Sequence, residues 1–168
     1  MNIFAANADL DIAILSFPDD QRPFKTGLQI SEKKLHDGDT VYSAGFPGLL
    51  GNPSWQFGTG VVTNSVAKVP EMINPEYSSV IQHSAQIDAG NSGGPLLIKN
   101  EEGVFEVAGI NAWKISNRQD ANFSIPAKTV KKFIDDALAG NNLLTDNKSN
   151  TPIKSQIIEP SFFFSVHT

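Results

Sequence analysis

The sequence contains no cysteine among its 168 residues. This absence excludes a disulfide framework, a thiolate metal site and a cysteine nucleophile. Basic residues are also in deficit, because 13 Lys and Arg stand against 18 Asp and Glu, for a formal net charge of -5. A partner held mainly through phosphate contacts, such as a nucleic acid, is therefore disfavoured.

Long apolar runs are absent as well. No window reaches the roughly 18 apolar residues that a membrane-spanning helix needs, and the late apolar cluster Phe162–Val166 is far too short. Met1–Asn7 has neither the basic region nor the apolar run of a secretory signal. We therefore expect a soluble chain without a membrane span.

The composition that is present predicts one globular domain with or without a tail. Apolar residues make up 40% of the chain and charged residues 18%, which is too apolar for a disordered protein. The 13 glycines, 10 prolines and 11 phenylalanines are typical of strands joined by tight turns.

Six segments with strand character are separated mostly by turns rich in glycine, proline or asparagine, a spacing typical of an antiparallel barrel. They are Thr40–Phe46, Gly58–Asn64, Ser79–Ala85, Gly94–Lys99, Val104–Trp113 and Ala121–Ile125. We expect another short strand around Leu10–Phe17 and a connecting strand at Lys25–Ser31. Apolar spacing predicts one helix, Ala127–Ala139, between Pro126 and Gly140.

The hexapeptide Gly90–Pro95 carries the strongest chemical signal, because it sets Ser92 among glycines before an apolar strand. A nucleophilic serine needs a tight turn that projects its hydroxyl. Glycines in that turn allow the amides of Gly90 and Ser92 to point at one spot, where an oxyanion would develop. The alternative is a simple glycine turn between two strands.

This hexapeptide resembles the nucleophile loop of chymotrypsin-fold (trypsin-like) serine peptidases, and within them the HtrA/Deg-like bacterial group. The resemblance extends in order and spacing over about residues 3–139. Further matching segments are Asp11–Leu15, Gly45–Leu49, Gly58–Val62, Ile81–Gln82, Ile87–Gly90, Gly109–Asn111 and Phe123–Pro126.

The resemblance implies an all-β fold, namely the antiparallel six-stranded second barrel of the chymotrypsin fold with a partial first barrel and a C-terminal helix. Residues 1–32 would hold the remnant of the first barrel and the connection between barrels. Residues 33–139 would form the second barrel and the helix, and residues 140–168 a polar tail with an apolar end. No cofactor is implied, and the partner would be a polypeptide substrate.

The resemblance also assigns catalytic roles. Ser92 would be the nucleophile, Asp11 would orient the general-base histidine, and the amides of Gly90 and Ser92 would form the oxyanion hole. Asp9 is a rival acid, but it lies outside the apolar strand. The resemblance places Gln86 at the floor of the primary specificity pocket, and an uncharged floor argues against selection of Lys or Arg. The other residues with substrate-binding roles would be Asn111, Ala112 and Phe123.

The general-base histidine of the family has no counterpart before Asp11. For His36, His83 and His167, a surface position or a satisfied hydrogen bond is the simpler interpretation. Because a triad without its base loses on the order of 10⁶ in turnover, we expect this chain alone to be nearly inactive as a peptidase.

Three hypotheses therefore stay open. The first is a serine endopeptidase domain whose histidine lies in sequence outside these residues. The second is a catalytically dead homologue that acts as a peptide-binding or interaction module, in which an exposed backbone edge beside Gly109–Trp113 holds an extended peptide by strand addition. Self-association through exposed strand edges is a separate expectation. The third is a truncated product without function. Family analogy suggests a bacterial periplasmic or other extracytoplasmic location.

Overall fold

The computed structural model describes residues 2–8, 10–17, 26–49, 52–68, 79–115, 118 and 120–140. Its ten strands and one helix are β1 Asn2–Asn7, β2 Ile12–Ser16, β3 Thr40–Gly45, β4 Gly48–Leu49, β5 Asn52–Pro53, β6 Gln56–Ala67, β7 Val80–His83, β8 Pro95–Lys99, β9 Phe105–Lys114, β10 Asn122–Pro126 and α1 Ala127–Leu138. Residues 141–168, including the predicted polar tail, lie outside the described residues.

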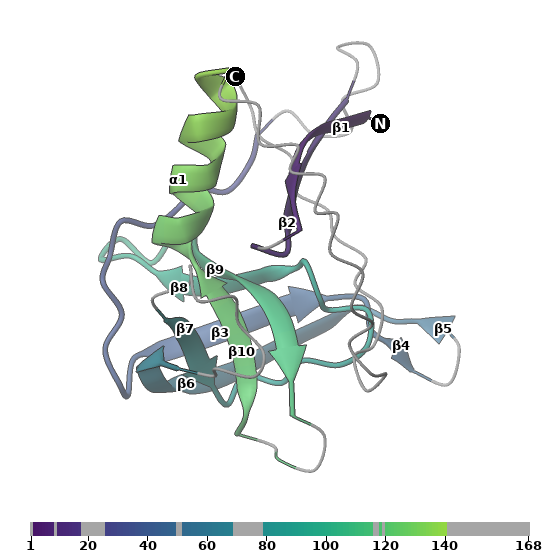
Figure 1. Cartoon of the computed structure of the whole chain (residues 1–168). Helices are drawn as coiled ribbons and strands as arrows, with labels where there is room; N and C mark the ends of the chain where they lie inside the picture. The colour runs from purple at the N-terminus through teal and green to yellow at the C-terminus, as the bar shows by residue number, and fades with distance from the viewer. Residues whose placement is uncertain are drawn as a thin grey trace.

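Six strands close into an antiparallel barrel in the order β10-β7-β6-β3-β8-β9 (Figure 1). They are the six strands that the sequence predicts, displaced by only a few residues at their ends, so the predicted all-β barrel is confirmed. Alternating apolar side chains fill the barrel interior, because every second residue of a strand points to the same face. The inner cluster consists of Leu35, Val41, Val62, Ile81, Ala85, Leu96, Ile98 and Ala108.

The connecting strand predicted at Lys25–Ser31 is wrong over its described part. Residues 26–29 have no strand structure, and Ile30 forms a single parallel bridge to Val107. The bridge is flanked by hydrogen bonds from the Ser31 amide to the Val107 carbonyl and from the Val107 amide to the Gln29 carbonyl, both 2.8 Å. It forms there because β10 ends its pairing with β9 at Gly109, which leaves this edge of β9 open.

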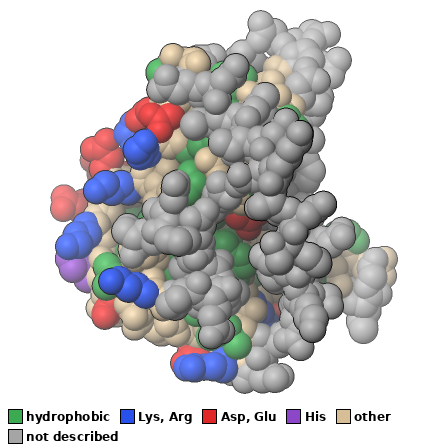
Figure 2. Space-filling view, viewed as in Figure 1, with side chains coloured by type: hydrophobic (Ala, Val, Ile, Leu, Met, Phe, Trp, Pro, Cys, Tyr) green, Lys and Arg blue, Asp and Glu red, His purple; other side chains and the backbone are tan. Residues whose placement is uncertain are grey.

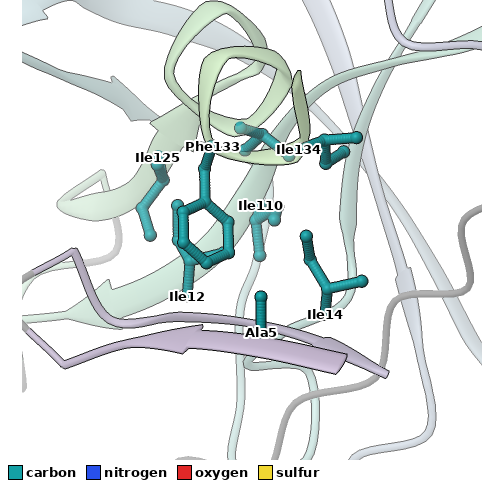
Figure 3. Close-up of a cluster of buried hydrophobic side chains, with 8 residues drawn as sticks. Ala5, Ile12, Ile14, Ile110, Ile125, Phe133 and Ile134 are labelled. Atoms are coloured by element: carbon teal, nitrogen blue, oxygen red, sulfur yellow. The ribbon is translucent and has the colours of Figure 1, made fainter. Parts of the chain in front are cut away.

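A separate hairpin of β1 and β2 stands against the barrel and the helix (Figure 1). The sequence predicted β2 but not β1 as a defined strand. Figure 3 shows Ala5, Ile12 and Ile14 of this hairpin facing Ile110 of β9 and Phe133 of α1. The hairpin, the barrel and α1 therefore share one apolar cluster, completed by Ile125, Val130 and Ile134.

The predicted helix is confirmed as α1, which begins directly after Pro126 and ends one residue earlier than expected. Its buried residues recur at helical spacing and face the shared cluster: Ala127, Val130, Phe133 and Ile134. The exposed face carries two Lys–Asp pairs four residues apart, Lys131–Asp135 and Lys132–Asp136. The proposed division after residues 32 and 139 stays a prediction.

The surface charges are mixed. Figure 2 shows basic and acidic side chains interspersed along one side of the molecule, without a large patch of one sign on the face in view. Over the described ranges, no helix is both long and apolar enough to cross a membrane.

Candidate active site

The turn that carries Ser92 joins β7 to β8 and is tied down on both sides of the serine. The Asn91 amide donates to the Asp88 carbonyl (2.9 Å), and the Gly94 amide donates to the Asn91 carbonyl (3.0 Å). On its far side the turn is bonded to β9, because the Gly93 amide donates to the Asn111 carbonyl at 2.7 Å. Backbone hydrogen bonds therefore fix the turn before and after Ser92.

Between residues 90 and 94, two backbone amides have no hydrogen-bond acceptor among the described residues. Within the described part of the chain, the amides of Gly90 and Ser92 donate no hydrogen bond, whereas those of Asn91, Gly93 and Gly94 all do. Ser92 is half-buried, and its hydroxyl likewise has no partner among these residues. Two unpaired amides beside a hydroxyl, separated by one residue, are suited to receive an anionic oxygen.

A side chain at position 90 would strain the backbone and collide with neighbouring backbone atoms. Its φ of +104° lies in the region that residues with a side chain rarely adopt. A Cβ here would lie 2.8 Å from the Phe46 carbonyl oxygen and 3.1 Å from Pro47 Cα, both backbone atoms. The amide of Gly48 also donates to the Ala89 carbonyl (3.0 Å). The chain after β3 therefore packs directly against the turn.

The side chain of Asn91 bonds the Ser92 turn to the start of β6. Its side chain is 1% exposed, and its Nδ2 donates to Gln56 Oε1 at the start of β6 (3.2 Å). A buried amide of this kind resists displacement, because leaving its donor unpaired costs about 1–3 kcal/mol. The sequence analysis missed the role of Gln56, since its partner lies 35 positions away.

Asp11 lies in the turn between β1 and β2. Its φ of +50° makes it the one non-glycine residue with a positive φ among those described. The next residue, Ile12, packs in the same cluster as Ile110, which directly precedes Asn111 on β9. The residue that follows Asp11 thus packs in the same cluster as the β9 residue next to Asn111, which is bonded to the Ser92 turn.

The carboxyl group of Asp11 has a raised pKa. Burial raises its pKa from 3.8 to about 6. Its side chain has no hydrogen bond or ion pair among the described residues. A partly buried carboxylate without a partner is suited to a cation or an N–H donor that the described residues do not supply.

Asp11→Asn is expected to stabilise the chain above pH 6, by about 1–2 kcal/mol once screening by solvent is allowed for. Between pH 3.8 and 6 the folded state retains a proton that the unfolded state releases. The carboxylate therefore costs stability above pH 6 and nothing below pH 3.8. Urea unfolding at pH 4 and pH 7.5 measures this difference, and asparagine tolerates the positive φ.

Asp37→Asn is the matched control with the opposite sign. Hydrogen bonding to the Ser65 amide lowers the pKa of Asp37, so its replacement is expected to weaken the fold at neutral pH. An Asp11→Asn variant that is equally or less stable at pH 7.5 would contradict the burial of an unpaired carboxylate.

The four predicted substrate-binding residues lie in different settings. Gln86 is exposed, and its Nε2 donates to Asp88 Oδ2 (2.8 Å). Ala112 is half-buried against the shared cluster, whereas Phe123 is 4% exposed and Asn111 is fully buried. No contact with a substrate tests these assignments, which stay predictions.

Neither described histidine contacts Ser92 or Asp11. His36 lies in an exposed turn beside Asp39, with its ring Nδ1 3.9 Å from Oδ2. His83 is fully buried on β7, where its Nε2 lies 2.9 Å from Ser124 Oγ. His167 and the rival acid Asp9 lie outside the described residues.

A closed six-stranded barrel with a glycine-flanked serine between two of its strands defines the class of trypsin-like serine peptidases. The chain belongs to this family, because the family model described as a trypsin-like peptidase domain matches residues 1–110. Within the family it is of the HtrA type.

Two curated relatives show this likeness. The serine protease Do-like HtrA of Bacillus subtilis is 33% identical over 134 residues, which cover 77% of this chain and 28% of the relative. The chloroplastic protease Do-like 5 of Arabidopsis thaliana is 26% identical over 140 residues, covering 79% and 40%. The chain therefore spans less than half the length of either relative.

Solved structures share the fold. The HtrA-type protease AlgW with decapeptide superposes with a TM-score of 0.68 at 21% identity, over 84% of this chain and 41% of that one. Deg5 superposes with a TM-score of 0.58 at 27% identity, over 78% and 57%.

Proposed function

We propose that this chain supplies the nucleophile, the acid and the oxyanion hole of a serine endopeptidase. Ser92 Oγ attacks the carbonyl carbon of a peptide bond, and the amine leaves to give an acyl-enzyme that water hydrolyses. The observation that carries the proposal is that, between residues 90 and 94, the amides of Gly90 and Ser92 donate no hydrogen bond within the described residues, whereas the amides on either side of Ser92 are bonded. The amides of Gly90 and Ser92 stabilise the oxyanion of the tetrahedral intermediate.

Asp11 is the acid of this proposal. Its carboxylate orients the general base and stabilises the imidazolium that forms when the base takes the Ser92 proton. The raised pKa of Asp11 supports this role, because a buried unpaired carboxylate gains most from a positively charged neighbour. The base is a histidine outside the 168 residues, so the chain alone is nearly inactive.

Substrate contacts are a further part of the proposal. Gln86 forms an uncharged floor for the side chain before the scissile bond, with Ala112 and Phe123 beside it, so that Lys and Arg are disfavoured. Asn111 is fully buried on β9, so its contribution to the substrate site is indirect, through the hydrogen bonds by which it holds residues 93–95. The relative AlgW was solved with a decapeptide, which fits a polypeptide substrate.

The proposed function can be tested by adding imidazole in place of the missing histidine base. A fluorophosphonate probe is expected to label Ser92 about 10³-fold faster than other serines, from the residual effect of the oxyanion hole. Added imidazole is expected to raise that rate by about tenfold or more, because it supplies general-base catalysis. Ser92→Ala abolishes labelling, whereas Ser31→Ala, at another buried serine, leaves it unchanged. Peptide mapping by mass spectrometry measures both effects.

Equal labelling of Ser92 and surface serines, with and without imidazole, would overturn the peptidase proposal and favour an interaction module. One observation supports that second candidate. β1 has only β2 as its partner among the described strands, and it exposes Ile3 (67%) and Phe4 (49%). An exposed apolar strand with a free edge pairs readily with another chain.

The double variant Ile3→Lys/Phe4→Lys is therefore expected to abolish concentration-dependent association in sedimentation velocity. The matched variant Val66→Lys, at a side chain that is 60% exposed on the barrel, leaves association unchanged. Undiminished association of the double variant would remove β1 as the contact surface.

A further inference from the structure

Three polar side chains lie completely inside the protein behind the Ser92 turn. His83 on β7, Asn111 on β9 and Ser124 on β10 are each 0% exposed. His83 Nε2 lies 2.9 Å from Ser124 Oγ, and Ser124 Oγ lies 3.0 Å from Asn111 Oδ1. The proposed peptidase chemistry uses neither His83 nor Ser124.

The direction of every hydrogen bond in this chain of side chains is fixed. The Pro95 carbonyl can only accept, so the Asn111 group 3.2 Å from it must be Nδ2. Asn111 Oδ1 therefore faces Ser124, whose hydroxyl must donate to it. Ser124 Oγ is then left to accept, which requires a proton on Nε2 of His83. Since burial lowers the pKa of His83 to about 4, the ring is neutral at pH 7 and carries that proton on Nε2.

Asn111 is also hydrogen-bonded to the three residues that follow Ser92. Its carbonyl accepts from the Gly93 amide (2.7 Å), its amide donates to the Gly94 carbonyl (2.9 Å), and its side chain donates to the Pro95 carbonyl (3.2 Å). One residue thus holds three consecutive residues of the turn. Only the bond to Pro95 is made by the side chain, so a rotation of that side chain would release the Pro95 carbonyl, next to the two residues that the backbone bonds hold.

We propose that His83 and Ser124 are positioning residues for the nucleophile, because they lock the Asn111 side chain and Asn111 in turn fixes residues 93–95 beside Ser92. A buried chain of hydrogen bonds favours one geometry, since breaking either of its bonds leaves a further buried polar group unpaired. His83 Nδ1 already has no hydrogen-bond partner among the described residues. Accuracy matters here, because a displacement of about 1 Å at a reacting group can cost about 10² in rate. The catalytic meaning of this arrangement rests on the proposed function.

The test compares Ser124→Ala with Ser124→Thr, which retains the hydroxyl, and with Ser31→Ala as a buried-serine control elsewhere. Amide hydrogen exchange measured by NMR reports the turn at Gly93 and the barrel at Val62. We expect Ser124→Ala to speed exchange at Gly93 by about tenfold more than at Val62, since net loss of one hydrogen bond is about 1.4 kcal/mol or tenfold. The other two variants retain the wild-type ratio. Equal acceleration at both amides would mean a purely structural role and would overturn the proposal.

Labelling of Ser92 by the fluorophosphonate probe in imidazole supplies the functional readout. Ser124→Ala is expected to slow it by about tenfold or more, and Ser124→Thr to restore it. Unchanged labelling with faster Gly93 exchange would overturn the positioning role while leaving the peptidase proposal intact. Absence of labelling in the unsubstituted chain would instead remove the peptidase proposal.

A measurement on the unsubstituted chain keeps the inference falsifiable if Ser124→Ala fails to fold. Nitrogen-15 shifts of the His83 ring at pH 7 are expected to show a proton on Nε2 and none on Nδ1. A proton on Nδ1 alone would break the assigned direction of the network and overturn the proposal.

Discussion

Gly90→Ala is expected to slow imidazole-assisted labelling of Ser92 by about 10²–10³-fold, the cost of losing one oxyanion-hole donor. The added methyl group meets the Phe46 carbonyl oxygen at 2.8 Å and Pro47 Cα at 3.1 Å. Backbone atoms cannot rotate away as a flexible side chain can, so the Gly90 peptide itself has to move. The rate of labelling, measured by intact mass, reports the loss.

Gly38→Ala is the matched control for this prediction. Gly38 has a similar φ of +92°, but a Cβ there would meet nothing within 4 Å. Gly38→Ala therefore introduces the backbone strain of a positive φ without the collision, and about 1–2 kcal/mol of stability is lost. Its labelling rate should equal that of the unsubstituted chain. Equal rates for Gly90→Ala and Gly38→Ala would show that the Gly90 amide plays no part in the reaction.

Phe133→Ala is expected to lower the free energy of unfolding by about 3–5 kcal/mol, the usual cost of removing a fully buried phenylalanine. Phe133 is 2% exposed and lies where α1, the β1–β2 hairpin and the barrel meet (Figure 3). The loss is a large part of the roughly 5–15 kcal/mol that stabilises a domain. Urea unfolding followed by circular dichroism measures it.

Leu138→Ala in the same helix is the control, because its side chain is 49% exposed and should cost less than about 1 kcal/mol. Phe133→Ala should also speed amide exchange in β2 more than in β6, since the hairpin depends on this cluster for its place. Because the proposed acid Asp11 lies in this hairpin, loosening the hairpin should reduce the imidazole effect at Ser92. Equal exchange in both strands would show that the hairpin is held by other contacts.

The barrel was predictable because its signals are local. Alternating apolar residues and turn residues predict the six strands, and Pro126 with helical spacing predicts α1. β1 was missed as a strand, since NIFAAN lacks a regular alternation. The strand prediction for Lys25–Ser31 was wrong because pairing there depends on which edge of β9 is open. No local sequence pattern contains that information.

The turn that carries Ser92 was predictable for the same reason, whereas the residues that hold it in place were not. Glycines around Ser92 mark a tight turn within six residues of sequence. Which amides stay free depends on Asn111, about 20 positions later, and its side chain depends on Ser124 and His83. The sequence left His83 as a surface residue or one with a satisfied hydrogen bond. The structure shows a buried histidine with a hydrogen bond, because His83 on β7 lies beside Ser124 on the neighbouring strand β10.

The most direct test follows the amide resonances of the nitrogen-15-labelled chain while a peptidyl boronic acid is added. Boron forms a tetrahedral adduct with a serine hydroxyl and places an oxygen where the oxyanion would develop. The account predicts that the amides of Gly90 and Ser92 shift downfield most, while the bonded amides of Asn91, Gly93 and Gly94 change little. No adduct at saturating boronate, or an adduct that moves the bonded amides as much as the two free ones, would contradict it.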